Sequence, residues 1–158
     1  MYIHIFALAM QLETSIRQTK FKSVHHKMLL NIIYSAGVIQ AEQARFFKHY
    51  DLSPQQYNVL RILRGQHPNP ASVGLLQERM LDQMSNASRL VEKLKQKNFL
   101  TRNACENDRR QMDVCITKDG LNLLNEIDDK FEIFEKRLAV LSESEANTLN
   151  QLLDKLNT

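Results

Sequence analysis

The sequence contains little glycine, proline or cysteine, and each shortage narrows the possible folds. Of its 158 residues, four are Gly, three are Pro and two are Cys. Few helix-breaking residues, together with abundant Leu, Gln, Glu, Lys and Ala, indicate a mostly helical protein. The two cysteines form no Cys-x-x-Cys spacing or Cys/His cluster, which argues against a structural zinc site and favours a reduced, cytoplasmic protein. We therefore expect a helical fold that depends on neither a metal nor a cofactor.

Catalytic motifs and long apolar runs are also missing. There is no glycine-rich phosphate loop, nucleophile elbow or metal-ligand spacing, so an enzyme is the least favoured class. The apolar start, MYIHIFALA, is short, lacks a basic beginning and is followed by polar residues. Neither a signal peptide nor a membrane span is expected from such a segment. Residues 1–21 are interpreted as a leader and a short N-terminal segment.

The net charge of +3 is unevenly distributed. Residues 1–50 hold six Lys or Arg against two Asp or Glu, residues 81–118 hold eight against five, and residues 119–158 hold four against nine. A basic middle followed by an acidic C-terminal arm indicates that only part of the molecule faces a polyanion, although a solvated surface would show the same counts.

Apolar residues that recur every three or four positions predict helices along most of the chain. The first is expected over about residues 22–48. Ser53 and Pro54 are good first residues for a second helix, and Ser72 for a short third helix. A fourth helix is expected from about Met84 to Lys97. Its inward stripe is formed by Ala87, Leu90, Val91 and Leu94.

Two short strands and two more helices complete the predicted elements. The segments Phe99–Arg102 and Met112–Thr117 favour strands, and the polar stretch between them favours a hairpin tip. A helical stripe then runs from Leu121 to Leu141. The pattern Ser142-x-x-Glu145 is a capping box that opens a final helix.

The order helix, helix, short helix, polar-faced helix and hairpin is that of a winged helix-turn-helix, whose fourth helix fits the DNA major groove. Small polar and cationic side chains on its outer face are suited to reading base edges, although most surface helices have polar outer faces. These candidate DNA-binding residues are Ser85, Asn86, Ser88, Arg89 and Lys93. Arg89 can bind the two acceptors of a guanine or a phosphate.

The predicted hairpin tip strengthens this interpretation. Arg109 and Arg110 on a projecting ribbon can enter the narrow minor groove, where the potential is most negative. The alternative for Asp108-Arg109-Arg110 is a local salt bridge that stiffens the turn.

These motifs resemble those of the MarR (multiple antibiotic resistance regulator) family. The family's wing carries Asp-x-Arg, then an apolar strand ending in Leu-Thr or Ile-Thr, then a Gly; here these are Asp108 to Arg110, Val114 to Thr117, and Gly120. Ser88–Leu94 and Leu52–Leu60 are similar to the family's recognition helix and to the start of its second helix. The resemblance covers about residues 22–156. Two departures are Asn98, where the family usually has Gly, and a turn over Met80–Ser85 that is about one residue longer.

The resemblance implies a mainly α fold with a small β-hairpin wing, braced by Asp108, and long dimerisation helices. Residues 51–117 would form the DNA-binding region, and residues 22–50 and 118–158 the dimerisation region. Two-fold symmetry would place two recognition helices on a pseudo-palindromic operator of double-stranded DNA. Such a homodimer would act as a transcription regulator, with a repressor relieved by a small aromatic or anionic effector as the favoured form. The helical stripes fit a dimer independently, because one small core cannot bury them all.

Three alternatives remain open at this stage. Cys105 lies near Arg102, Arg109 and Arg110, which could lower its thiol pKa and make the protein a redox-responsive regulator. A zinc sensor using His25, His26 and His49 is disfavoured, since adjacent helical residues point about 100° apart. A winged-helix module that binds protein rather than DNA would have no reason to direct several arginines one way.

Overall fold

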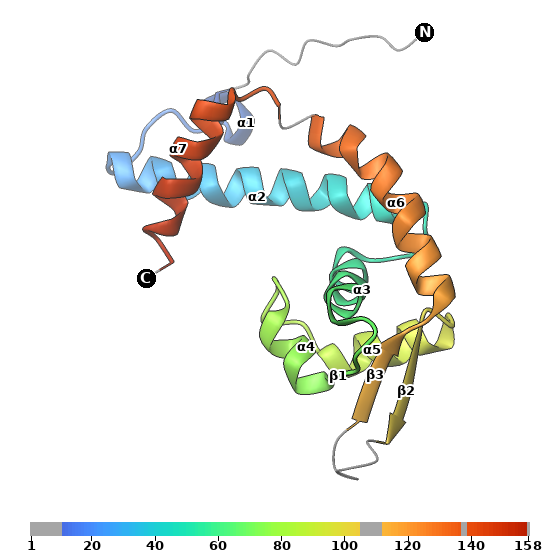
Figure 1. The fold of residues 1–158 in the computed structure, drawn as a ribbon. Helices are drawn as coiled ribbons and strands as arrows, with labels where there is room; N and C mark the ends of the chain where they lie inside the picture. The colour runs from blue at the N-terminus through green and yellow to red at the C-terminus, as the bar shows by residue number, and fades with distance from the viewer. Residues whose placement is uncertain (1–10, 105–111, 137–138, 158) are drawn as a thin grey trace, which may run out of the picture. The chain divides into compact units, whose positions relative to one another are not determined.

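The computed structural model describes residues 11–104, 112–136 and 139–157, and its chain divides into two compact units, residues 1–54 and 55–158 (Figure 1). The described part is mostly helical, with one small antiparallel sheet. This confirms the predicted fold class, including the hairpin wing.

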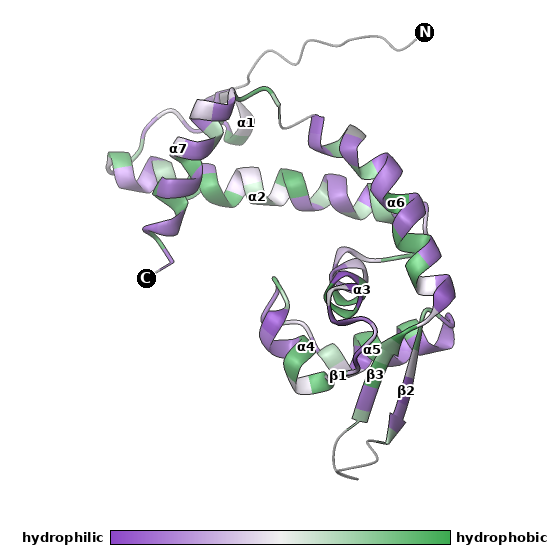
Figure 2. Ribbon diagram, viewed as in Figure 1, coloured by the Kyte–Doolittle hydropathy of each residue, from purple (hydrophilic) through white to green (hydrophobic). Residues whose placement is uncertain are grey.

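The first unit contains α1 (Leu12–Ile16) and α2 (Val24–Lys48). Ser23 caps α2, because its side-chain oxygen accepts the N–H of His26 at 3.1 Å. An ion pair between Lys27 and Glu13 joins the two helices. The long helix predicted over residues 22–48 is thus confirmed to within two residues. Hydrophobic residues recur along α2 in Figure 2, yet Phe47 is its one buried residue.

The described residues of the second unit form five helices and three strands. The helices are α3 (Pro54–Gln66), α4 (Val73–Arg79), α5 (Ala87–Gln96), α6 (Lys118–Lys136) and α7 (Glu143–Asp154). Two predicted caps are confirmed. Ser72 accepts the N–H of Leu75 at 3.1 Å at the start of α4, and Ser142 and Glu145 form a complete capping box on α7.

The core of the second unit lies between the helices and the sheet. Apolar residues from α3, α4, α5, both wing strands and α6 are buried there: Val59, Leu60, Leu63, Leu76, Val91, Leu94, Leu100, Val114, Leu124 and Ile127. The inward stripe predicted for the fourth helix is confirmed for Ala87, Val91 and Leu94, while Leu90 is half-buried. This burial fixes which face of α5 points outward. The long stripe predicted from Leu121 is divided, since α6 ends at Lys136 and Leu141 precedes α7.

The sheet has the order β1-β3-β2, and the strands are β1 (Ala71–Ser72), β2 (Leu100–Ala104) and β3 (Met112–Ile116). The ladder between β2 and β3 runs from the pair Leu100–Ile116 to the pair Ala104–Met112, which confirms the strands of the predicted hairpin. Figure 1 shows this hairpin extending away from α3, α4 and α5. Strand β1 was not predicted, because two residues are too short to show alternation.

The root of the hairpin is joined closely to the start of α6. Asn98, just before β2, has a φ of 61°, the left-handed conformation for which a glycine is the usual choice. Thr117 donates its hydroxyl to the carbonyl of Asn98 at 2.7 Å and accepts the N–H of Gly120 at 3.1 Å. A Cβ atom on Gly120 would lie 2.3 Å from the carbonyl oxygen of Phe99. Glycine is required here because the start of α6 approaches the backbone of Phe99, the residue before β2, too closely for a side chain.

Candidate nucleic-acid interface

The turn between α4 and α5 is held by side chains of the preceding helices. The amide of Gln77 spans it: Nε2 donates to the carbonyl of Gln83 and Oε1 accepts the N–H of Ala87, both at 3.1 Å. Asn58 of α3 accepts the N–H of Leu81 at 2.9 Å. The position of α5 relative to α3 and α4 is therefore fixed by hydrogen bonds as well as by its buried face.

A carboxylate organises the middle of the same turn. Asp82 accepts the hydroxyl of Ser85 at 2.7 Å, the Nε2 of Gln55 at 3.3 Å and the N–H of Met84 at 3.1 Å. The hydrogen bond from Ser85, followed by that from Gln55, lowers the pKa of Asp82 below its ordinary value. Asp82 is therefore ionised at neutral pH and places a negative charge beside the start of α5.

Helix α5 begins later than the sequence indicated. It was predicted from about Met84, but α5 starts at Ala87 and Asn86 is its N-cap, with Oδ1 accepting the N–H of Arg89 at 3.0 Å. Asn86 prefers this role because its side chain satisfies a backbone donor that the first turn leaves unpaired. Ser85 and Asn86 consequently precede the helix instead of lying on its outer face.

The outward face of α5 is polar and cationic. Ser88, Arg89 and Lys93 are all exposed, on the side opposite Ala87 and Val91. Arg89 and Lys93 are four residues apart, so they lie above one another on one helical face. Three of the predicted DNA-binding residues are thus brought together on one exposed surface.

An ion pair beside the exposed face of α5 marks one edge of its cationic surface. Glu92 of α5 forms an ion pair with Arg102 of β2, with a distance of 3.7 Å between Oε2 and Nη1. This contact between the helix and the wing strand was not predicted. It pairs the one acidic side chain of α5 with a cation on the wing strand.

Four predicted residues of the wing lie outside the described residues: Cys105, Asp108, Arg109 and Arg110. Cys115 on β3 is a free, half-buried cysteine. Burial raises the pKa of its thiol, and the charge of Asp113 raises it further, so Cys115 is a poor nucleophile at neutral pH.

The side chain of His26 makes local structural contacts in the first unit. The Nδ1 of His26 accepts the N–H of Lys22 at 3.3 Å, and its ring meets that of Phe21 edge-on at 6.2 Å. Within residues 11–104, 112–136 and 139–157, no group of three or more His, Cys, Asp and Glu is arranged to hold a metal ion. Nor does that part of the chain contain a helix long and apolar enough to cross a membrane.

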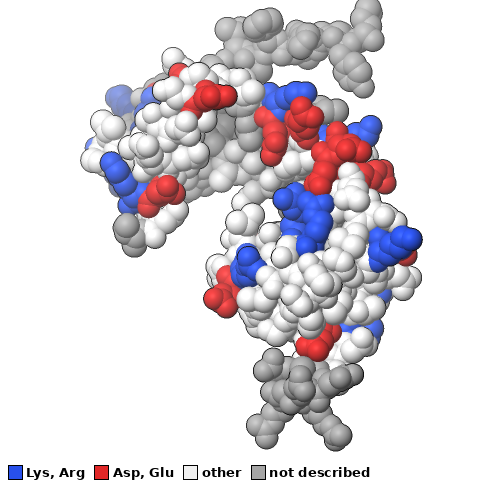
Figure 3. Space-filling view, in the orientation of Figure 1, with Lys and Arg blue, Asp and Glu red and all other residues white. Residues whose placement is uncertain are grey.

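A second polar cluster, which no sequence pattern predicted, joins α3 to α6. Asp128 accepts from Arg64 at 2.6 Å and from Arg61 at 3.3 Å, and Arg61 also donates to the hydroxyl of Tyr57 at 3.0 Å. The ring of Phe131 stacks on that of Tyr57 at 5.8 Å. In Figure 3 basic atoms gather over α3 beside acidic atoms over α6. The cluster combines two guanidinium groups with one carboxylate and an aromatic surface.

Comparison with known proteins places this geometry in a family. Residues 52–112 match the model of the MarR family. The chain is 31% identical over 109 residues to the HTH-type transcriptional regulator MhqR of Bacillus subtilis. This match covers 68% of this chain and 73% of that protein. It superposes with a TM-score of 0.75 on a MarR-like transcription regulator from Bacillus cereus, at 22% identity, over 84% of this chain and 95% of that one.

One further structure similar to this chain was solved with DNA bound. The chain superposes with a TM-score of 0.71 on MepR of S. aureus in a complex with DNA, at 19% identity, over 87% of this chain and 97% of that one. At this identity the likeness concerns the fold alone.

Proposed function

This chain belongs to the MarR family and is a DNA-binding transcription regulator, and we propose that it binds a pseudo-palindromic operator as a homodimer through α5 and the wing. One observation carries this proposal. Ser88, Arg89 and Lys93 are exposed together on a helix whose opposite face is buried and whose preceding turn is tied by side chains. A rigid rod with small polar and cationic groups at its N-terminal half is what the major groove admits.

We assign different roles to the residues of this surface. Arg89 is long enough to place its guanidinium on a guanine, and Lys93, one turn further, is suited to a phosphate. Ser88 is short and would read a base edge at close range. Asn86 uses Oδ1 for the cap, so its NH₂ group is the part that would reach an acceptor. The hydroxyl of Ser85 donates its proton to Asp82, so its oxygen can only accept a hydrogen bond from the DNA.

The wing would supply a second contact. Arg109 and Arg110 lie between β2 and β3 in the sequence. We propose that they bind the minor groove beside the site of α5, with Asp108 bracing the loop. Both grooves would then be bound by one protomer.

A second copy of the chain is the proposed partner of the apolar helices. Met28, Leu29 and Ile33 on α2 are 41%, 52% and 59% exposed, and α7 has no buried residue although Leu149 and Leu152 lie on it. Covering these side chains would gain about 25 cal/mol per Å² of apolar surface. We propose that residues 22–50 and 118–158 form the dimer interface, and that residues 51–117 bind DNA.

The cluster on α3 and α6 supports control by a small molecule. Two guanidinium groups share the single carboxylate of Asp128 beside the stacked rings of Tyr57 and Phe131. An aromatic anion could replace Asp128 as the partner of Arg61 and stack on the rings. We propose a cytoplasmic repressor whose operator binding is relieved by a small aromatic or anionic effector.

The test begins with selection of duplexes from random DNA, followed by titration with Arg89→Ala and Lys20→Ala. Both variants lose one positive charge, and Lys20 is exposed and lies outside the regions proposed to bind DNA or to form the dimer. If Arg89 contacts a base, its loss costs about 1–3 kcal/mol and relaxes preference at one position. Lys20→Ala should retain wild-type affinity.

Two results would refute the proposal. One is equal affinity of wild type and Arg89→Ala across salt concentrations, since a phosphate or base contact must change the affinity or its salt dependence. The other is a monomer in sedimentation at the concentrations that bind DNA. Ile33→Glu should weaken the dimer, and Lys20→Glu, which makes an exposed residue outside α2 acidic, is its control.

A further inference from the structure

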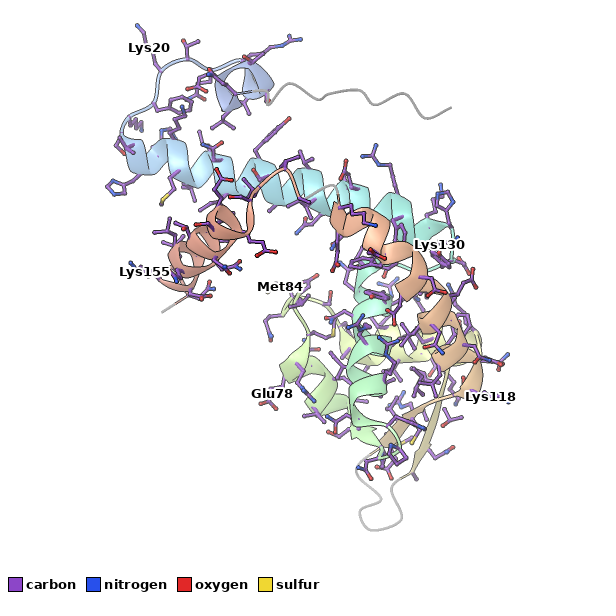
Figure 4. All side chains as sticks on the ribbon, turned by 45° about the horizontal axis from the view of Figure 1, so that its top comes forward. Lys20, Glu78, Met84, Lys118, Lys130 and Lys155 are labelled. Carbon is purple, nitrogen blue, oxygen red and sulfur yellow. The ribbon has the colours of Figure 1, made fainter. Side chains whose placement is uncertain are left out.

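The turn that precedes α5 exposes two large apolar side chains. Met84 is 94% exposed and Leu81 is 90% exposed, the highest values among the large hydrophobic residues that the structure describes. Figure 4 places Met84 at the free end of this turn, away from the interior formed by α3, α4 and α5. At this exposure, packing against the described residues of the protomer does not account for a methionine in this position.

The exposure of Met84 comes from a turn with a defined geometry. The N–H of Met84 donates to Asp82 at 3.1 Å, and the hydroxyl of the next residue, Ser85, donates to the same carboxylate at 2.7 Å. Gln83, on its other side, donates Nε2 to the carbonyl of Met80 at 2.8 Å. Because its neighbours are tied down on both sides, the backbone of Met84 is ordered before any partner arrives, which reduces the entropy lost on binding.

The place of Met84 in the chain indicates its partner. It lies two residues before Asn86, the N-cap of α5, at the end of a recognition helix that reads base edges in a helix-turn-helix. Asp82 carries a negative charge in the same turn, so this segment is unsuited to a phosphate and suited to the groove between the two backbones. The one apolar group in the major groove is the C5-methyl of thymine.

We propose that Met84 is a specificity-determining residue that contacts the C5-methyl group of a thymine in each half-site of the bound DNA. This inference rests on the proposed function, because it requires α5 to enter the major groove. Met84 selects thymine by apolar contact, which adds to the hydrogen-bonded contacts proposed for Ser88 and Arg89. A flexible thioether chain can follow the methyl group without an ideal approach.

The experiment removes the C5-methyl group from the DNA and, separately, the Met84 side chain from the protein. The duplex selected with wild-type protein is synthesised in a series of variants. In each variant, deoxyuridine replaces the two thymines at one symmetry-related position of the two half-sites, which deletes only their C5-methyl groups. We expect one pair of positions at which wild type binds about fourfold more weakly for each methyl group removed. Met84→Ala should bind the thymine and uracil duplexes equally, and Met84→Leu should keep part of the preference.

Leu81→Ala is the matched control, because Leu81 is equally exposed in the same turn but three residues further from α5. It should keep the wild-type preference for thymine at the sensitive position. Loss of that preference in Leu81→Ala but not in Met84→Ala would overturn the assignment, as would wild-type binding that no uracil substitution weakens. Failure to select any duplex would instead refute the proposed function, and the role of Met84 with it.

Discussion

Replacing Gly120 with alanine should destabilise the protein, although alanine is the better helix former. Gly120 lies in the first turn of α6, where an added Cβ would be 2.3 Å from the carbonyl oxygen of Phe99 and 2.8 Å from Cγ1 of Ile116. The first distance is more than about 1 Å short of an ordinary carbon contact. The carbonyl of Phe99 also accepts the N–H of Thr117 at 3.1 Å, so moving it weakens a hydrogen bond.

The net cost follows from three contributions. Overpacking typically costs about 1–3 kcal/mol, and a weakened hydrogen bond adds about 1 kcal/mol. The better helix propensity of alanine returns about 1 kcal/mol. We expect the free energy of unfolding to fall by about 1–3 kcal/mol, measured by urea unfolding followed by circular dichroism at a fixed protein concentration.

Gly65→Ala provides the control, because Gly65 is also helical but its added Cβ meets no atom within 4 Å beyond its chain neighbours and the local helix backbone. The same substitution should there raise the free energy of unfolding by about 0.5–1 kcal/mol. Equal effects at the two positions, or a gain at Gly120, would refute the argument that close approach to Phe99 requires the glycine.

Further predictions concern Asn98 and Cys115 of the second unit. Asn98→Val should lower the free energy of unfolding by about 1–2 kcal/mol, because a β-branched residue fits the left-handed conformation poorly. Asn98→Gly should not lower it. Equal melting temperatures of the two variants in thermal unfolding would contradict this. In a Cys105→Ser variant, Cys115 should react with iodoacetamide more slowly in the folded protein than in urea, since burial raises its pKa. The stability contributed by Cys115 should be complete below the unfolded thiol pKa of about 8.5 and be lost as pH rises through the folded value. Equal reaction rates in the two states would show that the folded thiol is not protected.

Local patterns in the sequence were sufficient to predict most of the fold. Ser72 and the Ser142-x-x-Glu145 box marked helix starts, because capping depends on residues within three positions of one another. The spacing of Ala87, Val91 and Leu94 identified the buried face of α5, and hence the opposite face that holds Arg89.

What the sequence did not reveal depends on contacts between distant residues. Asp128 meets Arg61 and Arg64 from more than sixty positions away, and no local spacing connects them. Strand β1 exists because Ala71 pairs with Val114. The start of α5 was placed too early, because the spacing of its apolar residues does not mark its first turn, whereas the hydrogen bond from the N–H of Arg89 to Asn86 does.

The amide of Gln77 carries a requirement that other chains with this turn would share. Its two ends bind groups of opposite polarity, the carbonyl of Gln83 and the N–H of Ala87. Glutamate at this position could satisfy only the N–H, lysine only the carbonyl, and asparagine is one methylene shorter. A chain that lacks glutamine here must therefore close the interval between its two helices with other contacts.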